Sequence, residues 1–174
     1  ETIQLIKGAG ALKYAGDASG GIIKTNFSTS LLMDSLYGYG SIGYTDNGKE
    51  NYVISKISKS FSSGANYGGS ISLKSNGDYN SPNYSLSNSA GKKIASTLFF
   101  SKNRITKEWG ITYSFFRQDI GILKSAHVGS LGDVARSVKS DIPLTIYPFS
   151  REIDNPKQEN EHHTLSLYYK SRGL

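Results

Sequence analysis

The feature that most constrains the fold is the order of connection lengths between runs of residues whose polarity alternates with a period of two. The expected strands cover residues 36–45, 50–61, 65–76, 93–102, 108–119 and 162–172. Ser62–Gly64 and Asn103–Lys107 are tight connections, Gly77–Lys92 and Ile120–Glu161 are long, and the first connection, Asp46–Lys49, is also short. From the second connection onward, short and long alternate. A transmembrane β-barrel produces this pattern, because its turns are short on one side of the membrane and its loops are longer on the other.

The strands have the length and the polarity pattern of a membrane wall. A tilted membrane strand needs ~9–11 residues, whereas ~5–6 is the commonest length in soluble proteins. The clearest alternation sets Trp109, Ile111, Tyr113 and Phe115 against Gly110, Thr112 and Ser114. Because successive side chains of a strand point to opposite faces, this run has one apolar and one polar face. Trp109, Tyr113, Tyr168 and Tyr169 suit the aromatic girdle of a barrel, with ordinary core packing as the alternative.

Composition favours β-structure and excludes several other classes. The 174 residues include 12 Tyr, 7 Phe and 19 Gly but only 4 Pro, and aromatic residues are enriched in strands. The chain has no Cys, which excludes disulfide and thiol chemistry. The net charge of +6 is scattered along the chain, so we expect no nucleic-acid partner. No run approaches the ~18–20 apolar residues of a transmembrane helix.

The first 25 residues differ in pattern from the rest. Glu1–Gly8 is an extended run that ends at a glycine, and Ala9–Ala15 suits a single helical turn. Gly16–Gly21 is a glycine-rich turn that leads into a short strand at Ile22 and Ile23. This turn matches neither a Walker loop nor a GxGxxG sequence at the start of a helix, so the sequence does not favour phosphate binding.

This N-terminal pattern resembles the end of the plug domain in TonB-dependent outer-membrane receptors. The resemblance is carried by Ile3–Gly8 (IQLIKG), Leu12–Tyr14 (LKY) and Ala18–Ile23 (ASGGII). The family pattern is approximately IEVIKGP, then LYG, then AxGGVIN. The matching residues are Lys7, Gly8, Tyr14, Ala18, Gly20 and Gly21, and the departures are Gln4 for Glu, Ala9 for Pro, and Ala15-Gly16 where one Gly follows the Tyr. The matching residues are expected to have a structural role, in which the glycines let the backbone turn tightly.

The downstream sequence is similar to a branch of the same family that is common in Bacteroidetes-type bacteria. The similar segments are Gly77–Asn83, Ile120–Lys124 with Ala126–Gly129, and Ile153–Pro156 through Glu161–His163. The resemblance therefore spans nearly the whole chain.

The resemblance implies an all-β fold in two parts. Residues 1–25 would be the C-terminal end of a plug domain, and residues 26–174 would be about six strands of a partial antiparallel transmembrane β-barrel, out of about 22. Because six strands cannot close such a barrel, we expect an internal fragment of a longer receptor. The implied function is TonB-dependent active uptake of a ferric siderophore or other metal complex across the bacterial outer membrane. Implied partners are TonB, which contacts an upstream part of the receptor, outer-membrane lipid and the nutrient ligand; no cofactor is implied.

The candidate substrate contacts lie in or beside the long Ile120–Glu161 connection. Arg117 precedes it on the apolar side of its strand, where a rim-facing or snorkelling side chain is the alternative. His127, His162 and His163 are the only histidines, and neutral imidazole is a good ligand for transition metals. His162 and His163 point to opposite faces of a strand and are therefore poorly placed to chelate one ion together. Hydrogen bonding within the loop is the simpler interpretation of all three.

Two other functional classes compete with transport. The first is a soluble all-β binding or adhesion module whose lysine-rich loops engage an anionic glycan or surface. The second is an outer-membrane enzyme of a smaller barrel type. The sequence contains no GxSxG turn, no HExxH helix and no candidate nucleophile–base pair, so we do not expect an enzyme.

Overall fold

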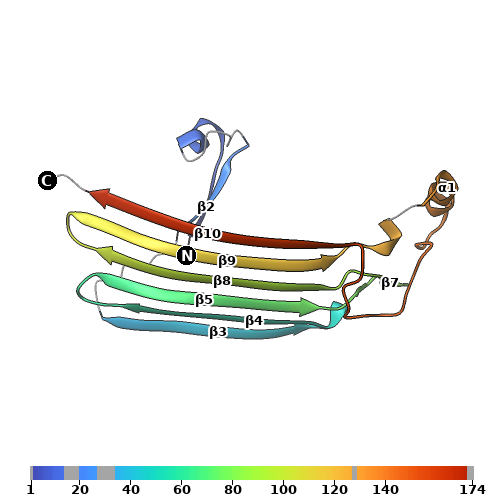
Figure 1. The fold of residues 1–174 in the computed structure, drawn as a ribbon, viewed down its shortest axis with the longest axis horizontal. Helices are drawn as coiled ribbons and strands as arrows, with labels where there is room; N and C mark the ends of the chain where they lie inside the picture. Colours follow the sequence, from blue (N-terminus) through green and yellow to red (C-terminus); the bar gives the residue numbers. More distant parts are fainter. Residues whose placement is uncertain (1, 14–19, 27–33, 127–128, 172–174) are drawn as a thin grey trace.

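The structure is a computed structural model that describes residues 2–13, 20–26, 34–126 and 129–171 (Figure 1). Its main body is one six-stranded antiparallel sheet in the order β10-β9-β8-β5-β4-β3. The strands are β3 (Ser35–Thr45), β4 (Glu50–Ser60), β5 (Ala65–Asn76), β8 (Gly91–Asn103), β9 (Lys107–Gly121) and β10 (Lys157–Ser171). Each long strand pairs with the next one along the chain. All six predicted strands are therefore confirmed, and so is the antiparallel all-β class.

The structure extends three of the predicted strands toward the long connections, and one of them is β9, which ends at Gly121. β8 begins at Gly91 and β10 begins at Lys157, which pairs with Gly121 of β9. The first residues of β10 are polar or charged on both faces, so they show no alternation of polarity. Strand pairing continues there because the backbone hydrogen bonds of the ladder do not depend on side-chain polarity.

The N-terminal segment forms a separate antiparallel pair. β1 (Thr2–Ile6) and β2 (Ile22–Asn26) pair with Ile6 opposite Ile22, and the helical turn η1 (Gly8–Lys13) follows β1. The predicted extended run, helical turn and short strand are thus confirmed within the described residues, whereas Glu1, Tyr14 and Ala15 lie outside them. Gly8 and Gly21 have positive φ angles of 69° and 107°, as expected where the backbone turns tightly.

The connections sort by length to the two ends of the sheet. The turns after β4 and β8 are short and lie at one end, which we call the short-turn end. The long connections lie at the other end, the long-loop end, and contain β6 (Tyr79–Asn80), β7 (Ser85–Leu86), η3 (Lys124–Ala126) and α1 (Leu131–Lys139) (Figure 1). The predicted alternation is confirmed for these four connections. The short turn around η2 (Asn47–Lys49) lies with the long loops, where the Gly77 N–H donates to the Gly48 carbonyl at 2.8 Å.

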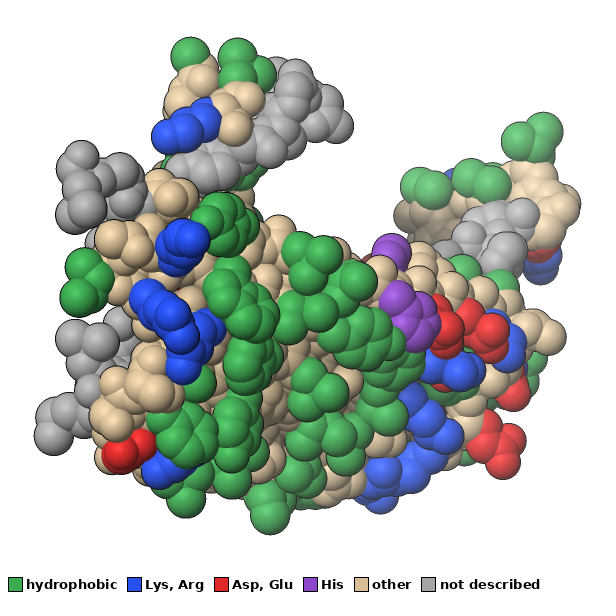
Figure 2. Space-filling model, turned by 60° about the vertical axis from the view of Figure 1, so that its left-hand side comes forward, with side chains coloured by type: hydrophobic (Ala, Val, Ile, Leu, Met, Phe, Trp, Pro, Cys, Tyr) green, Lys and Arg blue, Asp and Glu red, His purple; other side chains and the backbone are tan. Residues whose placement is uncertain are grey.

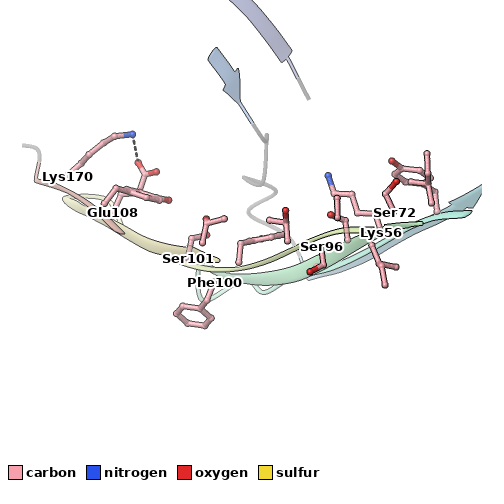
Figure 3. A pocket seen from close by; sticks show the side chains of 17 residues that line it. Lys56, Ser72, Ser96, Phe100, Ser101, Glu108 and Lys170 are labelled. Carbon is pink, nitrogen blue, oxygen red and sulfur yellow. Dashed lines mark ion pairs between the residues drawn. The ribbon is translucent and has the colours of Figure 1, made fainter. Parts of the chain in front are cut away.

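The sheet is open and curved, and no apolar core lies beneath it in the part of the chain that the structure describes. β3 and β10 are its edges, and no sheet is closed. In Figure 3, Lys56, Ser101, Glu108 and Lys170 project from the concave face, whereas Phe100 projects from the convex face. β1 and β2 lie on the concave side (Figure 3). Ala11 and Ala90 are the only buried hydrophobic side chains in the described ranges.

Candidate functional site: the two faces of the sheet and its loop cap

The convex face carries a continuous apolar band that nothing in the described structure covers. Strand pairing aligns its side chains, which are Leu36, Ile42, Tyr44, Val53, Ile57, Tyr67, Ile71, Leu73, Ile94, Leu98, Phe100, Trp109, Ile111, Tyr113, Phe115, Leu165, Leu167 and Tyr169. Ile42 is 82% exposed and Leu167 is 71% exposed. Figure 2 shows this band with basic side chains on one side and a mixture of acidic, basic and histidine side chains on the other. An uncovered patch of this extent marks a surface that meets lipid or another protein.

Aromatic side chains lie toward both limits of the band. Near the short-turn end, the Phe100 and Trp109 ring centroids are 5.3 Å apart. Toward the long-loop end, the His163 ring lies 5.0 Å from Phe115, and its Nδ1 is 2.7 Å from the Tyr113 hydroxyl. Of the four residues predicted for a girdle, Trp109, Tyr113 and Tyr169 share this face. Tyr168 is on the concave face, because it precedes Tyr169 in the same strand.

The concave face is polar and is hollowed at its centre. The hollow has a volume of about 570 Å³ and is lined largely by small side chains such as Ser70, Ser72 and Ala95. Lys56 reaches it from β4, and the Glu108–Lys170 ion pair, 3.8 Å between Oε2 and Nζ, bounds it toward the short-turn end (Figure 3). Because small residues from adjacent strands are in register here, the sheet leaves room for a ligand or another segment above it.

Two tyrosines of the concave face fold over the glycines that pair with them. Tyr52 of β4 is the register partner of Gly43, and Tyr168 of β10 is the register partner of Gly110. A Cβ atom on Gly110 would lie 2.6 Å from the Tyr168 ring, and one on Gly43 would overlap the Tyr52 ring. The glycines thus create space for the rings, and the rings cover backbone that a glycine leaves bare.

The long connections pack into a cap that is held by buried polar side chains. Asn88 is 4% exposed, and its Nδ2 donates to the carbonyl oxygens of Ile122 (2.9 Å), Asp154 (3.1 Å) and Pro156 (2.8 Å). Its Oδ1 accepts from the Asp154 N–H at 2.9 Å. Asn88 has a φ angle of 65°, which Asn tolerates better than most residues. One side chain from the 77–90 connection therefore holds both ends of the 122–156 connection.

Asp78 fixes the other side of the same cap. It is 1% exposed, and its two carboxylate oxygens accept from the N–H groups of Ser89 (2.8 Å) and Ser150 (3.1 Å). A carboxylate whose oxygens accept backbone hydrogen bonds can be buried without a cation.

A three-residue contact joins the cap to the concave face. The Tyr79 hydroxyl donates to Glu50 Oε2 at 2.8 Å, and Lys74 Nζ lies 2.8 Å from the same oxygen. Burial, and then the hydrogen bond to Glu50, raise the pKa of Tyr79 to about 12. Tyr79 is therefore a hydrogen-bond donor throughout the physiological pH range.

The predicted substrate contacts do not form one cluster. Arg117 and His163 lie on the convex face, where Arg117 is 3.6 Å from Asp119 and 3.8 Å from Glu161. His162 lies on the concave face beside Phe116, with ring centroids 6.1 Å apart. The prediction that the two adjacent histidines face opposite ways is confirmed. His127 and the motif residues Tyr14 and Ala18 lie outside the described residues.

Lys7, Gly8, Gly20 and Gly21, the other predicted motif residues, lie next to β1 and β2. Within the described ranges, no group of three or more His, Asp or Glu side chains is arranged to hold a metal ion. The sequence did not indicate the hollow, because its lining residues come from several strands.

No family model, curated protein or solved structure matches this chain. In the described part of the chain, no helix is long and apolar enough to cross a membrane.

Proposed function

We propose that this chain is part of the wall of an outer-membrane β-barrel, with its convex face in contact with lipid. The observation that carries the proposal is the pairing of an uncovered apolar convex face with a polar concave face on one sheet. Removing a Leu or Ile side chain from water is worth ~1.5–3 kcal/mol, so a band of such residues left in water would be costly. A bilayer offers this band an apolar environment, and the polar face suits the interior of a barrel.

The oblique course of the band supports the membrane assignment. Its limit toward the long loops is Tyr44 on β3 but Leu165 on β10, and Leu165 is in register with Gly38 of β3 through the intervening strands. That limit shifts by about six residues, or roughly 20 Å, across five strand spacings of ~4.8 Å. The opposite limit, from Leu36 to Tyr169, shifts by about two residues in the same direction. Averaged over the two limits, the strands are inclined by about 30° to the direction that crosses the band at a right angle within the sheet. If the band follows the membrane plane, this direction is the membrane normal, and the inclination is close to the ~35–45° of membrane barrels.

The biological role that we propose is TonB-dependent uptake of a scarce nutrient of the class of ferric siderophores and other metal complexes. The support is the resemblance of the N-terminal segment to a plug end, together with the position of β1 and β2 on the concave side of the sheet. In this proposal the N-terminal segment is the end of a plug inside the barrel, and the capped long loops face outward. His162 is the predicted contact that shares the concave face with the hollow.

Spin labels on opposite faces of one strand test the membrane assignment. This chain has no Cys, so Leu98→Cys and Thr97→Cys each introduce its one labelling site at the centre of β8, and any cysteine elsewhere in the complete protein is replaced by Ser. In the protein encoded by the complete gene, reconstituted in bilayers, the label at 98 should be relaxed by oxygen and the label at 97 by a water-soluble nickel chelate. Equal relaxation at the two sites, or folding into a soluble protein without detergent, would contradict the proposal.

Uptake in cells tests the role. A strain that lacks the gene should lose energy-dependent uptake of a labelled iron complex, and the intact gene should restore it. The restored uptake should disappear when TonB is deleted. Unchanged uptake of a panel of iron complexes, cobalamin and oligosaccharides in the deletion strain would refute the transport role.

A further inference from the structure

The concave face carries more positive charge than its acidic groups neutralise. Its lysines are Lys56, Lys74, Lys93 and Lys170, and its acidic residues in the described strands are Glu50 and Glu108. Both carboxylates are paired, Glu50 with Lys74 at 2.8 Å and Glu108 with Lys170 at 3.8 Å. Among the described residues of this face, no carboxylate is therefore left to neutralise Lys93.

The most unusual pair on this face is Lys74 and Lys93, which are direct register partners on β5 and β8. Like charges placed opposite each other destabilise a sheet. Glu50 offsets the charge of Lys74. Lys93 instead lies over the Phe116 ring, with Nζ 5.2 Å from its centroid, and has no acidic partner among the described residues. A local arrangement that opposes stability is expected where a ligand uses it.

Polar side chains continue this row across the sheet. Tyr52 is the register partner of Lys74, Gln118 is the partner of Lys93, and Asn160 is the partner of Gln118. We call Tyr52, Lys74, Lys93, Gln118 and Asn160 the basic ledge. It lies between the loop cap and the central hollow, and it offers two ammonium groups, two amides and a hydroxyl. Together these groups supply mainly hydrogen-bond donors.

We propose that the basic ledge binds the anionic groups, carboxylate or phosphate, of the small ligand that the protein takes up. This inference rests on the proposed function and narrows its substrate class. Lysine ammonium groups bind such oxygens as point charges, and the amides add neutral donors. A concave surface with a net positive charge also concentrates anionic ligands. The ligand meets the ledge after the loops and before the hollow.

Adjacent residues of β8 supply a matched test. Lys93→Gln removes a charge from the concave face, and Lys92→Gln removes the same charge from the convex face one residue earlier. Binding of ferric citrate and of pyrophosphate is measured by calorimetry with the detergent-solubilised protein encoded by the complete gene, at low salt. Lys93→Gln should weaken binding of at least one anionic probe about three- to tenfold, whereas Lys92→Gln should change it less than about 1.5-fold.

A conservative substitution and a change of salt concentration separate a charge effect from a structural one. Lys93→Arg should retain most of the binding, and the Lys93→Gln effect should shrink at ~0.5 M salt because exposed charges are then screened. Equal effects of Lys92→Gln and Lys93→Gln would overturn the proposal, as would binding of a neutral ferric trihydroxamate in preference to both anions. If uptake is lost on gene deletion but is unchanged by Lys93→Gln, the proposed ligand binding by the basic ledge is wrong and the transport role stands.

Discussion

At the scale of single residues, buried polar side chains rather than apolar ones hold the long-loop end together. Asn88 and Asp78 are 4% and 1% exposed, and both satisfy backbone groups that are distant in sequence. A buried carbonyl or N–H that loses its partner costs ~1–3 kcal/mol. The shape of the cap therefore depends on a few side chains, and each should be sensitive to substitution.

Asn88→Ala should loosen the 122–156 connection without unfolding the sheet. The substitution removes the donor for three carbonyls and places Ala at a positive φ, so we expect local opening to become easier by about 2–4 kcal/mol. Hydrogen exchange and limited proteolysis of this connection measure the effect. The control is Asn83→Ala, which alters an exposed asparagine of the same 77–90 connection. Equal protection of the connection in the two variants would contradict the role of Asn88.

The glycines of the sheet differ in how closely the neighbouring backbone approaches them. A Cβ atom on Gly68 would lie 2.5 Å from the Ile57 carbonyl oxygen, whereas one on Gly40 meets nothing nearer than 3.9 Å. Gly68→Ala should lower the free energy of unfolding by about 1–3 kcal/mol, as overpacking does. Gly40→Ala should leave it nearly unchanged. Denaturant titration measures the free energy of unfolding of the two variants. An equal loss in both would contradict the close packing of Gly68 against the backbone of β4.

At the scale of elements, α1 differs from the strands because it packs extensively against no other described helix or strand. None of its residues is buried, and Leu131 and Val138 are 89% and 81% exposed. Its N-terminus is capped by Ser130, whose Oγ accepts from the Asp133 N–H at 3.2 Å. Asp133 also forms an ion pair with Arg136 one turn later. Short helices are marginal in water, so these local contacts decide whether α1 persists.

Ser130→Ala should therefore destabilise α1 by about 1 kcal/mol, the usual cost of losing a Ser cap. Hydrogen exchange at the first amides of the helix measures this loss. Ser137→Ala is the control, since it replaces a serine in the helix by a better helix former. The assignment of Ser130 as the cap fails if the two substitutions change protection equally.

The same helix should respond to acid. The hydrogen bond from Arg136, and then that from Ser130, hold the pKa of Asp133 below its ordinary value of 3.8. Because the pKa is lower in the folded helix, ionised Asp133 stabilises α1 above about pH 4, and this contribution is lost as the pH falls further. Amide protection of α1 should decline in that range, and Asp133→Asn should remove this part of the pH dependence. A pH profile that is unchanged in Asp133→Asn would contradict it.

At the scale of the whole molecule, the proposed membrane assignment places the two faces of the sheet in different surroundings. Leu98→Lys and Thr97→Lys add the same charge to neighbouring positions of β8, one convex and one concave. At the centre of a bilayer a lipid-facing Lys costs ~2–4 kcal/mol, whereas a residue facing the interior of a barrel keeps access to water. Leu98→Lys should therefore impair folding of the complete protein into bilayers far more than Thr97→Lys. Equal losses in folding titrations would argue against a lipid-facing convex surface.

Much of the sheet could be predicted from local sequence, because the geometry of an extended backbone places successive side chains on opposite faces of a strand. The alternation of Trp109, Ile111 and Tyr113 with Gly110 and Thr112 separates the two faces whatever the strand packs against. The six strands, the division of connections by length and the opposite orientation of His162 and His163 follow from such patterns. The start of β10 at Lys157 could not be found in this way, since its first residues are polar on both sides.

The sites depended on tertiary structure because they join residues that are distant in sequence. Lys74 and Lys93 become neighbours only when β5 pairs with β8, and Asn88 reaches Asp154 only when the two long connections meet. Arg117 and His162 were candidates for one function, but the pairing of β9 with β10 puts them on opposite faces. The sequence by itself determined which side chains share a face, since that depends only on position along a strand. The tertiary structure decided which face is concave and what gathers there, because curvature and register arise only when strands pair.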